Sequence, residues 1–253
     1  MKKAYLITSA INIDNSYPLT YSPVRSFFTA EDRLRHTIMT IASLDMHSDD
    51  ETTLYLLDMS SDWEKYRYIF SYQKNLKFIS VKEQFPEIYQ TVTTHPNKSY
   101  CECLLLSTFM QLYRNELEQY DFLIKMSGRY FLDSSFDTAV FNMYNKDKIF
   151  YKKPREYNWQ DTWGYNMVDR RVEQQNNCIR QYCSVTFGWG SSRSPQFLDM
   201  FTGMAAILSQ ESNSHYDVET LGYYFTRPFV DDIIETDWIV YGWQGADGQF
   251  MRY

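Results

Sequence analysis

The chain has 253 residues, of which 44% are hydrophobic and 23% charged, and its formal net charge is −7 at pH 7. This composition is typical of a globular protein and excludes a collagen-like, low-complexity or intrinsically disordered chain. The acidic balance also disfavours binding along a nucleic-acid backbone, which needs a basic surface. No apolar run reaches the roughly 18 residues of a membrane span.

The N-terminus resembles a signal peptide at first sight, because two lysines precede an apolar run. Asn12 and Asp14 interrupt that run early, so we expect a first strand instead. The expected location is therefore cytoplasmic, with at most peripheral association with the inner face of a membrane. The four cysteines form no CxxC pair, which favours buried free thiols over a structural zinc site.

Strands and helices alternate in the first half of the chain. Apolar runs predict strands at residues 4–11, 53–59, 76–81 and 122–126. Apolar residues at helical spacing predict helices at residues 30–47, 61–73 and 98–119. Thr29, followed by Glu31 and Asp32, is expected to cap the first of these helices. This alternation indicates an α/β fold with right-handed crossovers and a mainly parallel, Rossmann-like sheet flanked by helices.

The second half is less regular. Strands are expected at residues 148–153, 178–188 and 233–243. Short helices are expected at residues 135–144, 195–208 and 217–225. The polar and aromatic residues 154–177 show no periodicity and predict a long loop. No linker separates domains, so residues 1–253 are expected to form one domain.

Ligands of open α/β sheets bind at the carboxyl ends of the strands. The first strand ends at Thr8 and Ser9, and the second ends at Asp58. The fourth runs into Lys125-Met126-Ser127-Gly128-Arg129, which is the sharpest feature of the chain. Gly128 allows close backbone approach, and the guanidinium of Arg129 matches a phosphate. We expect a diphosphate site here; the alternative is that Lys125 pairs with a core carboxylate and Arg129 caps a helix.

Three further cations are candidates for the same site. Arg25 follows the first strand, and Arg33 lies in the first helical turn, where a cation opposes the helix dipole. An anionic ligand would explain Arg33; an ion pair with a neighbouring carboxylate is the alternative. Lys98 opens a helix that can hold an anion, with Glu102 one turn later facing the same site. The alternative for these two is an i,i+4 surface pair.

Candidate catalytic groups alternate in His215-Tyr216-Asp217-Val218-Glu219. In an extended segment His215, Asp217 and Glu219 point the same way, and one of them can deprotonate an acceptor hydroxyl. The alternative is that Asp217 caps a helix. Aromatic residues make up 18% of the chain, and rings of this kind stack on sugars. The alternative is a coding bias with a tyrosine-rich core.

Several of these motifs are similar to those of small bacterial glycosyltransferases of surface-polysaccharide loci, which extend O-antigen, capsule or lipooligosaccharide chains. The similarity covers residues 3–133 and is carried by Tyr21-Ser22-Pro23-Val24-Arg25-Ser26, Thr29-Ala30-Glu31-Asp32-Arg33, Lys98-Ser99 and Lys125-Met126-Ser127-Gly128-Arg129-Tyr130-Phe131. It implies a GT-A-like fold with a nucleotide-binding half, residues 1–133, and an acceptor half, residues 134–253. It also implies a nucleotide sugar as co-substrate, a glycan or glycolipid acceptor and no tightly bound cofactor.

The chain departs from that family at one motif. Glycosyltransferases of this fold carry an Asp-x-Asp at the end of the fourth strand, where it holds a divalent metal on the donor diphosphate. Here the position reads Ser127-Gly128-Arg129. Lys125 and Arg129 can stabilise a leaving diphosphate electrostatically, so we expect transfer without a bound metal.

The resemblance then assigns roles to the candidate residues. Thr8, Ser9 and Asp58 line the nucleotide pocket. The residues expected to face the phosphates are Arg25, Arg33, Lys98, Lys125, Ser127, Gly128 and Arg129. Asp217, Glu219 or His215 is expected to be the base if the transfer inverts the anomeric centre, and the loop residues Trp159, Trp163 and Tyr165 are expected to stack on a sugar. The competing hypotheses are a CMP-sugar-dependent transferase and a non-catalytic glycan-binding module.

Overall fold

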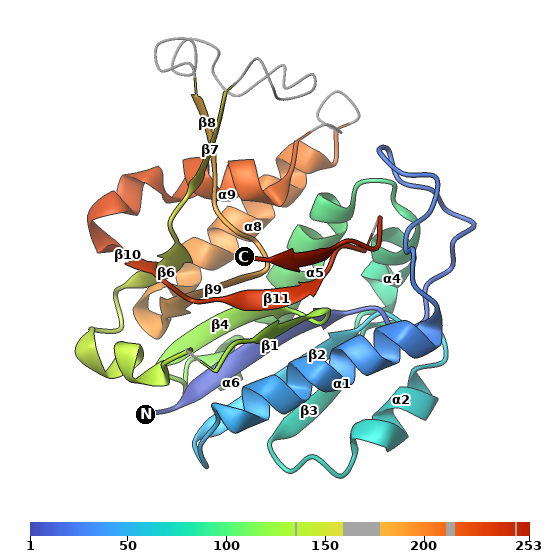
Figure 1. Cartoon of the computed structure of the whole chain (residues 1–253), viewed down its shortest axis with the longest axis horizontal. Coiled ribbons are helices and arrows are strands. Elements are labelled where there is room, and N and C mark those ends of the chain that lie inside the picture. The colour runs from blue at the N-terminus through green and yellow to red at the C-terminus, as the bar shows by residue number, and fades with distance from the viewer. Residues whose placement is uncertain (135, 159–177, 211–215, 246) are drawn as a thin grey trace.

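The computed structural model describes residues 1–134, 136–158, 178–210, 216–245 and 247–253 and is built around a seven-stranded sheet (Figure 1). Its strand order is β10-β6-β9-β4-β1-β2-β3. The strands span β1 (Lys3–Ser9), β2 (Thr52–Asp58), β3 (Leu76–Ser80), β4 (Phe122–Ser127), β6 (Ile149–Lys152), β9 (Thr186–Gly190) and β10 (Ile233–Thr236). All neighbours pair in parallel except β9, which runs antiparallel to both β4 and β6. The prediction of a mainly parallel sheet is confirmed.

Helices cover both faces of this sheet. Along β1, Tyr5 and Ile7 share a core with α1 (Ala30–Met46) and α2 (Trp63–Phe70). The alternate residues Ala4 and Leu6 belong to the core on the opposite face. The helices of that face are α3 (Val81–Gln84), α4 (Pro86–Thr94), α5 (Lys98–Leu112), α6 (Arg114–Leu117), α8 (Ser194–Leu208) and α9 (Val218–Thr226). Such strands, buried on both sides, explain the continuous apolar runs of the sequence.

Polar residues fix where the main helices begin. Thr29 forms a capping box with Asp32 at the start of α1, as expected. Asn97 accepts from the backbone N–H of Tyr100 at 3.1 Å and caps α5. These caps satisfy backbone donors that the helix itself cannot, and they determine which residues open each helix.

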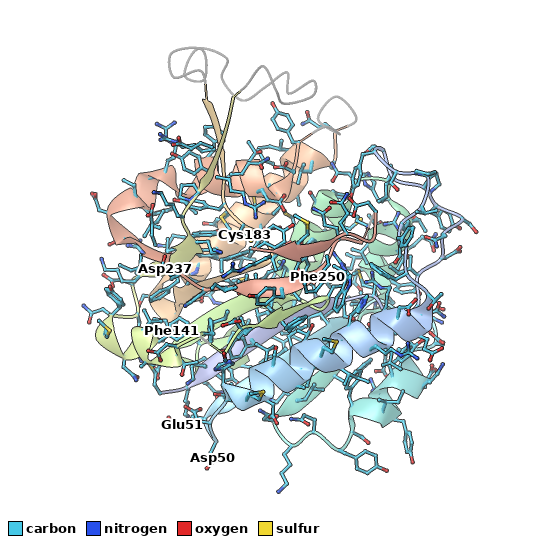
Figure 2. The ribbon with its side chains drawn as sticks, viewed as in Figure 1. Asp50, Glu51, Phe141, Cys183, Asp237 and Phe250 are labelled. Carbon is cyan, nitrogen blue, oxygen red and sulfur yellow. The ribbon has the colours of Figure 1, made fainter. Side chains whose placement is uncertain are left out.

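A second, antiparallel sheet lies on the α1 side of the molecule. It contains β5 (Tyr130–Leu132), β11 (Val240–Trp243) and β12 (Phe250–Arg252) in the order β12-β11-β5. Between the sheets, Phe141 packs against Phe122, Phe150 and Trp238 at centroid distances of 4.9–5.7 Å; Phe141 and Phe250 are labelled in Figure 2. Much of the aromatic content is therefore core, which was the alternative to sugar stacking.

Shorter elements complete the structure. A hairpin is formed by β7 (Arg155–Asn158) and β8 (Cys178–Gln181). The 3₁₀ segments are η1 (Thr138–Met143), η2 (Ser191–Arg193) and η4 (Arg227–Asp232). Within the described ranges, no helix is both long and apolar enough to cross a bilayer. Cys101, Cys103 and Cys183 are buried free thiols, as expected.

Several predicted boundaries were wrong. The helix expected at 98–119 ends at Leu112, and α3 and α4 were not predicted. The run 178–188 is divided between β8 and β9, and the run 233–243 is divided between β10 and β11 of different sheets. The loop expected at 154–177 begins with β7. Hydrophobic patterns locate buried segments, but they do not mark where the chain leaves one sheet for another.

Candidate functional site

A cavity of about 320 Å³ lies at the carboxyl ends of β1 and β4. Its walls come from these strand ends, from the loop over residues 10–29, and from α4 and α5. In Figure 1 that loop is the blue segment that lies beside α4. Thr8, Ser9 and Ser127, predicted from the strand ends, all line the cavity. This is the edge of an open α/β sheet at which ligands usually bind.

Four cationic side chains line the cavity: Arg25, Arg33, Lys98 and Arg129. Among the residues that the structure describes, none of the four forms an ion pair with a carboxylate. Gathering like charges in a half-buried space is costly without a counter-charge. The arrangement is suited to an anion with several oxygen atoms.

Arg33 points inward from the first turn of α1. Its Nε donates to the carbonyl of Ala10, and its Nη1 donates to Ser26 Oγ at 3.4 Å. Burial, and then the neighbouring charge of Arg129, lowers the pKa of Arg33 to about 9. The alternative of a local ion pair does not apply to Arg33, because Arg35 makes that pair, with Glu31 at 2.6 Å.

Arg25 is held by carbonyl groups instead of acids. Its Nη1 donates to the carbonyl of His95 at 2.9 Å and to that of Tyr17 at 3.4 Å. Asn15 Oδ1 in turn accepts from the backbone N–H of Arg25 at 2.9 Å. These contacts fix the loop against the end of α4 and place the guanidinium of Arg25 at the cavity.

Lys98 and Arg129 approach each other at Gly245. A Cβ built on Gly245 would lie 3.3 Å from Arg129 Cζ and 3.5 Å from Lys98 Nζ. Arg129 Nε donates to the carbonyl of Trp243 at 3.1 Å, and Lys98 donates to the carbonyl of Arg25. Burial, followed by the charges of Arg129, Arg33 and Arg25, lowers the pKa of Lys98 to about 7. A bound anion would reverse this effect.

Lys125 corrects one expectation. It does not line the cavity but is 1% exposed, and its Nζ contacts Glu102 Oε1 at 2.6 Å and Ser127 Oγ at 2.9 Å. It also donates to the carbonyl of Ser184. Three acceptors saturate the ammonium, so the alternative of a core ion pair describes Lys125, and the expected phosphate contact is absent from this arrangement.

Glu102 lies at the boundary between this ion pair and the cavity. Its Oε1 accepts from Thr8 Oγ1 at 3.0 Å in addition to Lys125, and the residue lines the cavity. Lys98 and Glu102 therefore face the same site, as expected. They do not form the i,i+4 surface pair, because each has another partner.

Asp58 and Gly128 support the strand ends and do not line the cavity. Asp58 is fully buried and accepts from the backbone N–H groups of Ile11 at 3.2 Å and Ser60 at 2.9 Å. Burial raises the pKa of its carboxyl group. A Cβ on Gly128 would lie 3.0 Å from the carbonyl oxygen of Thr8, so glycine is needed here for close packing of β4 on β1.

The candidate bases divide between two roles. Asp217 caps α9, accepting from the backbone N–H of Thr220 at 2.7 Å, which was the alternative to catalysis. Glu219 accepts from Ser184 Oγ, and burial, followed by the charge of Asp217, raises the pKa of its carboxyl group. Ser184 therefore connects Glu219 to Lys125, because its hydroxyl donates to Glu219 and its carbonyl accepts from Lys125. The remaining candidates His215, Trp159, Trp163 and Tyr165 fall outside the described residues.

The residues do not fit the divalent metal that the GT-A resemblance implies. Arg129 occupies the end of β4 where carboxylates would be needed, and its charge would repel a cation. In the described part of the chain, no three His, Cys, Asp or Glu side chains are grouped to hold a metal ion.

Two parts of the site were missed from the sequence. Gly245 and Trp243 are more than a hundred residues from Arg129, and neither belongs to a motif. His36 stacks on Trp243 with ring centroids 4.2 Å apart, and burial, then Arg33 and Arg129, lowers its pKa to about 4. A lone histidine in an amphipathic helix carries no sequence signal for such a contact.

Comparison with solved structures finds glycosyltransferases. The apo form of mouse xyloside xylosyltransferase 1 is similar to this chain with a TM-score of 0.51 and 9% identity, over 94% of this chain and 86% of that one. The glycosyltransferase GlyE of Streptococcus pneumoniae has a TM-score of 0.47 and 11% identity, over 94% of this chain and 45% of that one. No family model and no curated protein sequence matches the chain. The fold is that of the GT-A glycosyltransferases, as the resemblance implied.

Proposed function

We propose that the protein transfers a sugar from a nucleoside diphosphate sugar to a hydroxyl group of a bacterial surface glycan. The observation that carries this proposal is the cluster of Arg25, Arg33, Lys98 and Arg129 around one cavity at the ligand-binding edge of the sheet. The fold shared with a xylosyltransferase supports the enzyme class. The acceptor is a glycan or glycolipid reached from the cytoplasmic face of the membrane.

The number of cations favours a diphosphate over the single phosphate of a CMP-linked sugar. Arginine guanidinium groups bind phosphate oxygens in a planar, bidentate manner, and three arginines with one lysine exceed what one phosphate needs. The leaving nucleoside diphosphate gains negative charge as the glycosidic bond breaks. Preorganised cations stabilise that charge in the transition state, which is the role a metal has in other enzymes of this fold.

The remaining roles are proposed for residues of the strand ends, for Glu219, which is not among the lining residues of the cavity, and for the aromatic loop. Thr8, Ser9 and Ser127 contact the nucleotide at the strand ends, and Asp58 shapes the loops that hold it. Glu219 is the base if the transfer inverts the anomeric centre, because its raised pKa suits proton abstraction near neutral pH. Trp159, Trp163 and Tyr165 remain proposed acceptor contacts.

Thermal stabilisation by nucleotides tests the proposal. Saturation at 100 times Kd adds about 2.7 kcal/mol to the free energy of unfolding, or roughly 5–10 °C in Tm for a protein of this size. We expect UDP, GDP or TDP to give such a shift, and CMP to give none. A shift with CMP alone would point to the CMP-sugar transferase, and binding of a glycan without any nucleotide would contradict an enzymatic role.

Metal dependence is tested by adding EDTA to the nucleotide-binding assay and to an assay of turnover. We expect turnover and nucleotide binding to persist in EDTA, since the cations belong to the protein. Loss of turnover in EDTA and its recovery with Mn²⁺ would contradict the metal-independent mechanism without affecting the proposed enzyme class.

A further inference from the structure

A buried ion pair brings a carboxylate into the wall of the cavity, on the same helix as Lys98. Glu102 lies one turn further along α5, and its side chain is 23% exposed. Asp14 also lines the cavity but is not buried. A carboxylate repels phosphate oxygens, so Glu102 weakens a site devoted only to phosphate. Its presence needs a separate explanation.

The positive charge of Lys125 offsets the cost of placing this carboxylate in the wall of the cavity. The ammonium group contacts Glu102 Oε1 at 2.6 Å, and Thr8 Oγ1 donates to the same oxygen at 3.0 Å. The second oxygen, Oε2, has no hydrogen-bond partner among the described residues. The ion pair is thus neutral overall, and among the described residues it leaves one carboxylate oxygen of a cavity-lining side chain without a partner. In a nucleotide sugar, the groups that donate to such an atom are mainly hydroxyls.

The position of Glu102 indicates which part of the nucleotide sugar supplies this hydroxyl. On one side Lys98 joins Arg25 and Arg129 at the proposed phosphate site. On the other side Lys125 donates to the carbonyl of Ser184, whose own hydroxyl donates to Glu219. Glu102 therefore lies between the phosphate site and the proposed base, which is where the transferred sugar has to be.

We propose that Glu102 is a specificity-determining residue that accepts a hydrogen bond from a hydroxyl of the transferred sugar, with Lys125 positioning its carboxylate. This inference rests on the proposed function. A charge-assisted hydrogen bond of this kind contributes roughly tenfold or more in affinity. Free nucleoside diphosphate makes no such contact, so its affinity should not depend on Glu102.

The test compares sugars that differ by one hydroxyl group. The probes are UDP, GDP and TDP, their conjugates with glucose and galactose, and the monodeoxy analogues of the conjugate that binds best. The variant E102L/K125M removes both buried charges together, since removing one alone leaves the other uncompensated. E118Q, in which an exposed carboxyl group that pairs with Arg114 is lost, is the control. Affinities are measured by calorimetry.

In the wild type, one monodeoxy analogue should bind about tenfold more weakly than the intact conjugate. In E102L/K125M the intact conjugate should lose the same factor, and removing that hydroxyl should then cost nothing further. Free diphosphate should bind within about twofold of the wild-type affinity, and E118Q should behave as wild type. If E102L/K125M does not fold, E102Q is the second variant: its amide oxygen still accepts a hydrogen bond from Lys125, and the expected loss for the intact conjugate is about threefold.

Three outcomes overturn the inference. The first is an unchanged cost of the missing hydroxyl in the variant, and the second is an equal loss for free diphosphate. The third is a wild-type protein in which no conjugate binds more tightly than its free diphosphate, which would leave the phosphate site intact. If none of the three diphosphates binds to the wild type, the proposed function fails, and this inference fails with it.

Discussion

Arg129 lines the cavity, and we expect it to contribute to ligand binding far more than to the stability of the fold. Within the described ranges its guanidinium makes one hydrogen bond, from Nε to the carbonyl of Trp243. We predict that R129A lowers kcat/KM by roughly 10²–10³-fold, as for other groups that stabilise transition-state charge. The free energy of unfolding should fall by only about 1 kcal/mol.

Enzyme kinetics and urea denaturation measure these two quantities. R35A is the matched control, because Arg35 is an exposed arginine of α1 in an i,i+4 pair with Glu31. That variant should keep full activity and nearly full stability. A loss of stability in R129A that accounts for its loss of activity would show that Arg129 is structural.

The lowered pKa of Lys98 predicts that diphosphate binding depends on pH. This pKa is about 7, lowered by burial and then by three arginines, and a bound diphosphate is expected to raise it. Above pH 7, binding therefore takes up a proton, and the affinity for diphosphate should fall as the pH rises from 7 towards 9, by at most tenfold per pH unit. Calorimetry across this range, in buffers of different ionisation enthalpy, measures both effects.

K98M is the informative comparison for this effect. The variant should bind diphosphate more weakly than the wild type at pH 6, and its affinity should be almost flat between pH 7 and pH 9. A wild-type affinity that does not change with pH, or a K98M protein with an unaltered slope, would rule out Lys98 as the titrating group.

Two glycines test how closely the elements pack. At Gly128, directly after β4, a Cβ would lie 3.0 Å from the carbonyl oxygen of Thr8, so a methyl group fits only if this backbone shifts by a few tenths of an ångström. We predict that G128A costs about 1–3 kcal/mol in the free energy of unfolding. At Gly222, inside α9, a Cβ would meet nothing within 4 Å, and G222A should gain about 0.5–1 kcal/mol through helix propensity. Denaturant midpoints of both variants decide this; equal effects would contradict the packing argument.

The regular elements could be predicted from the sequence because burial on both faces leaves a strong pattern. The strands β1, β2, β3 and β4 and the helix α1 were located within one or two residues. The partner of Lys125 could not be predicted, since it depends on α5 packing under β4 so that Glu102 reaches the ammonium group. Arg33 and Arg35 are two residues apart, and only the three-dimensional position of α1 determines which of them enters the cavity.

The two halves of the chain share one sheet. The strands β1 to β4 come from residues 1–133, whereas β6, β9 and β10 come from residues 134–253, with β9 paired to β4. In addition, α5 of the first half packs on α8 of the second, and Phe109 and Phe201 belong to one core. We therefore propose that the nucleotide-binding and acceptor halves form a single folding unit.

We predict that residues 1–133 do not fold when expressed alone. The fragment would lose the pairing of β4 with β9 and expose the face of α5 that packs on α8, and only about 5–15 kcal/mol typically separates folded from unfolded proteins. The whole chain should unfold in one cooperative transition, and the fragment should give an NMR spectrum with little dispersion. A well-dispersed spectrum of the fragment would show that the halves are separate domains.

The reversed direction of β9 has a consequence for how such proteins diversify. Because this strand runs against its neighbours, the segment before it, residues 182–185, arrives at the edge where the parallel strands end, and Ser184 meets Lys125 there. A change in the length or composition of this segment would alter the surroundings of the Lys125–Glu102 pair while leaving the four cations of the cavity in place. If the protein is the proposed transferase, exchanging this one short connection would be a way to change the hydroxyl compound it accepts without changing how it holds the diphosphate.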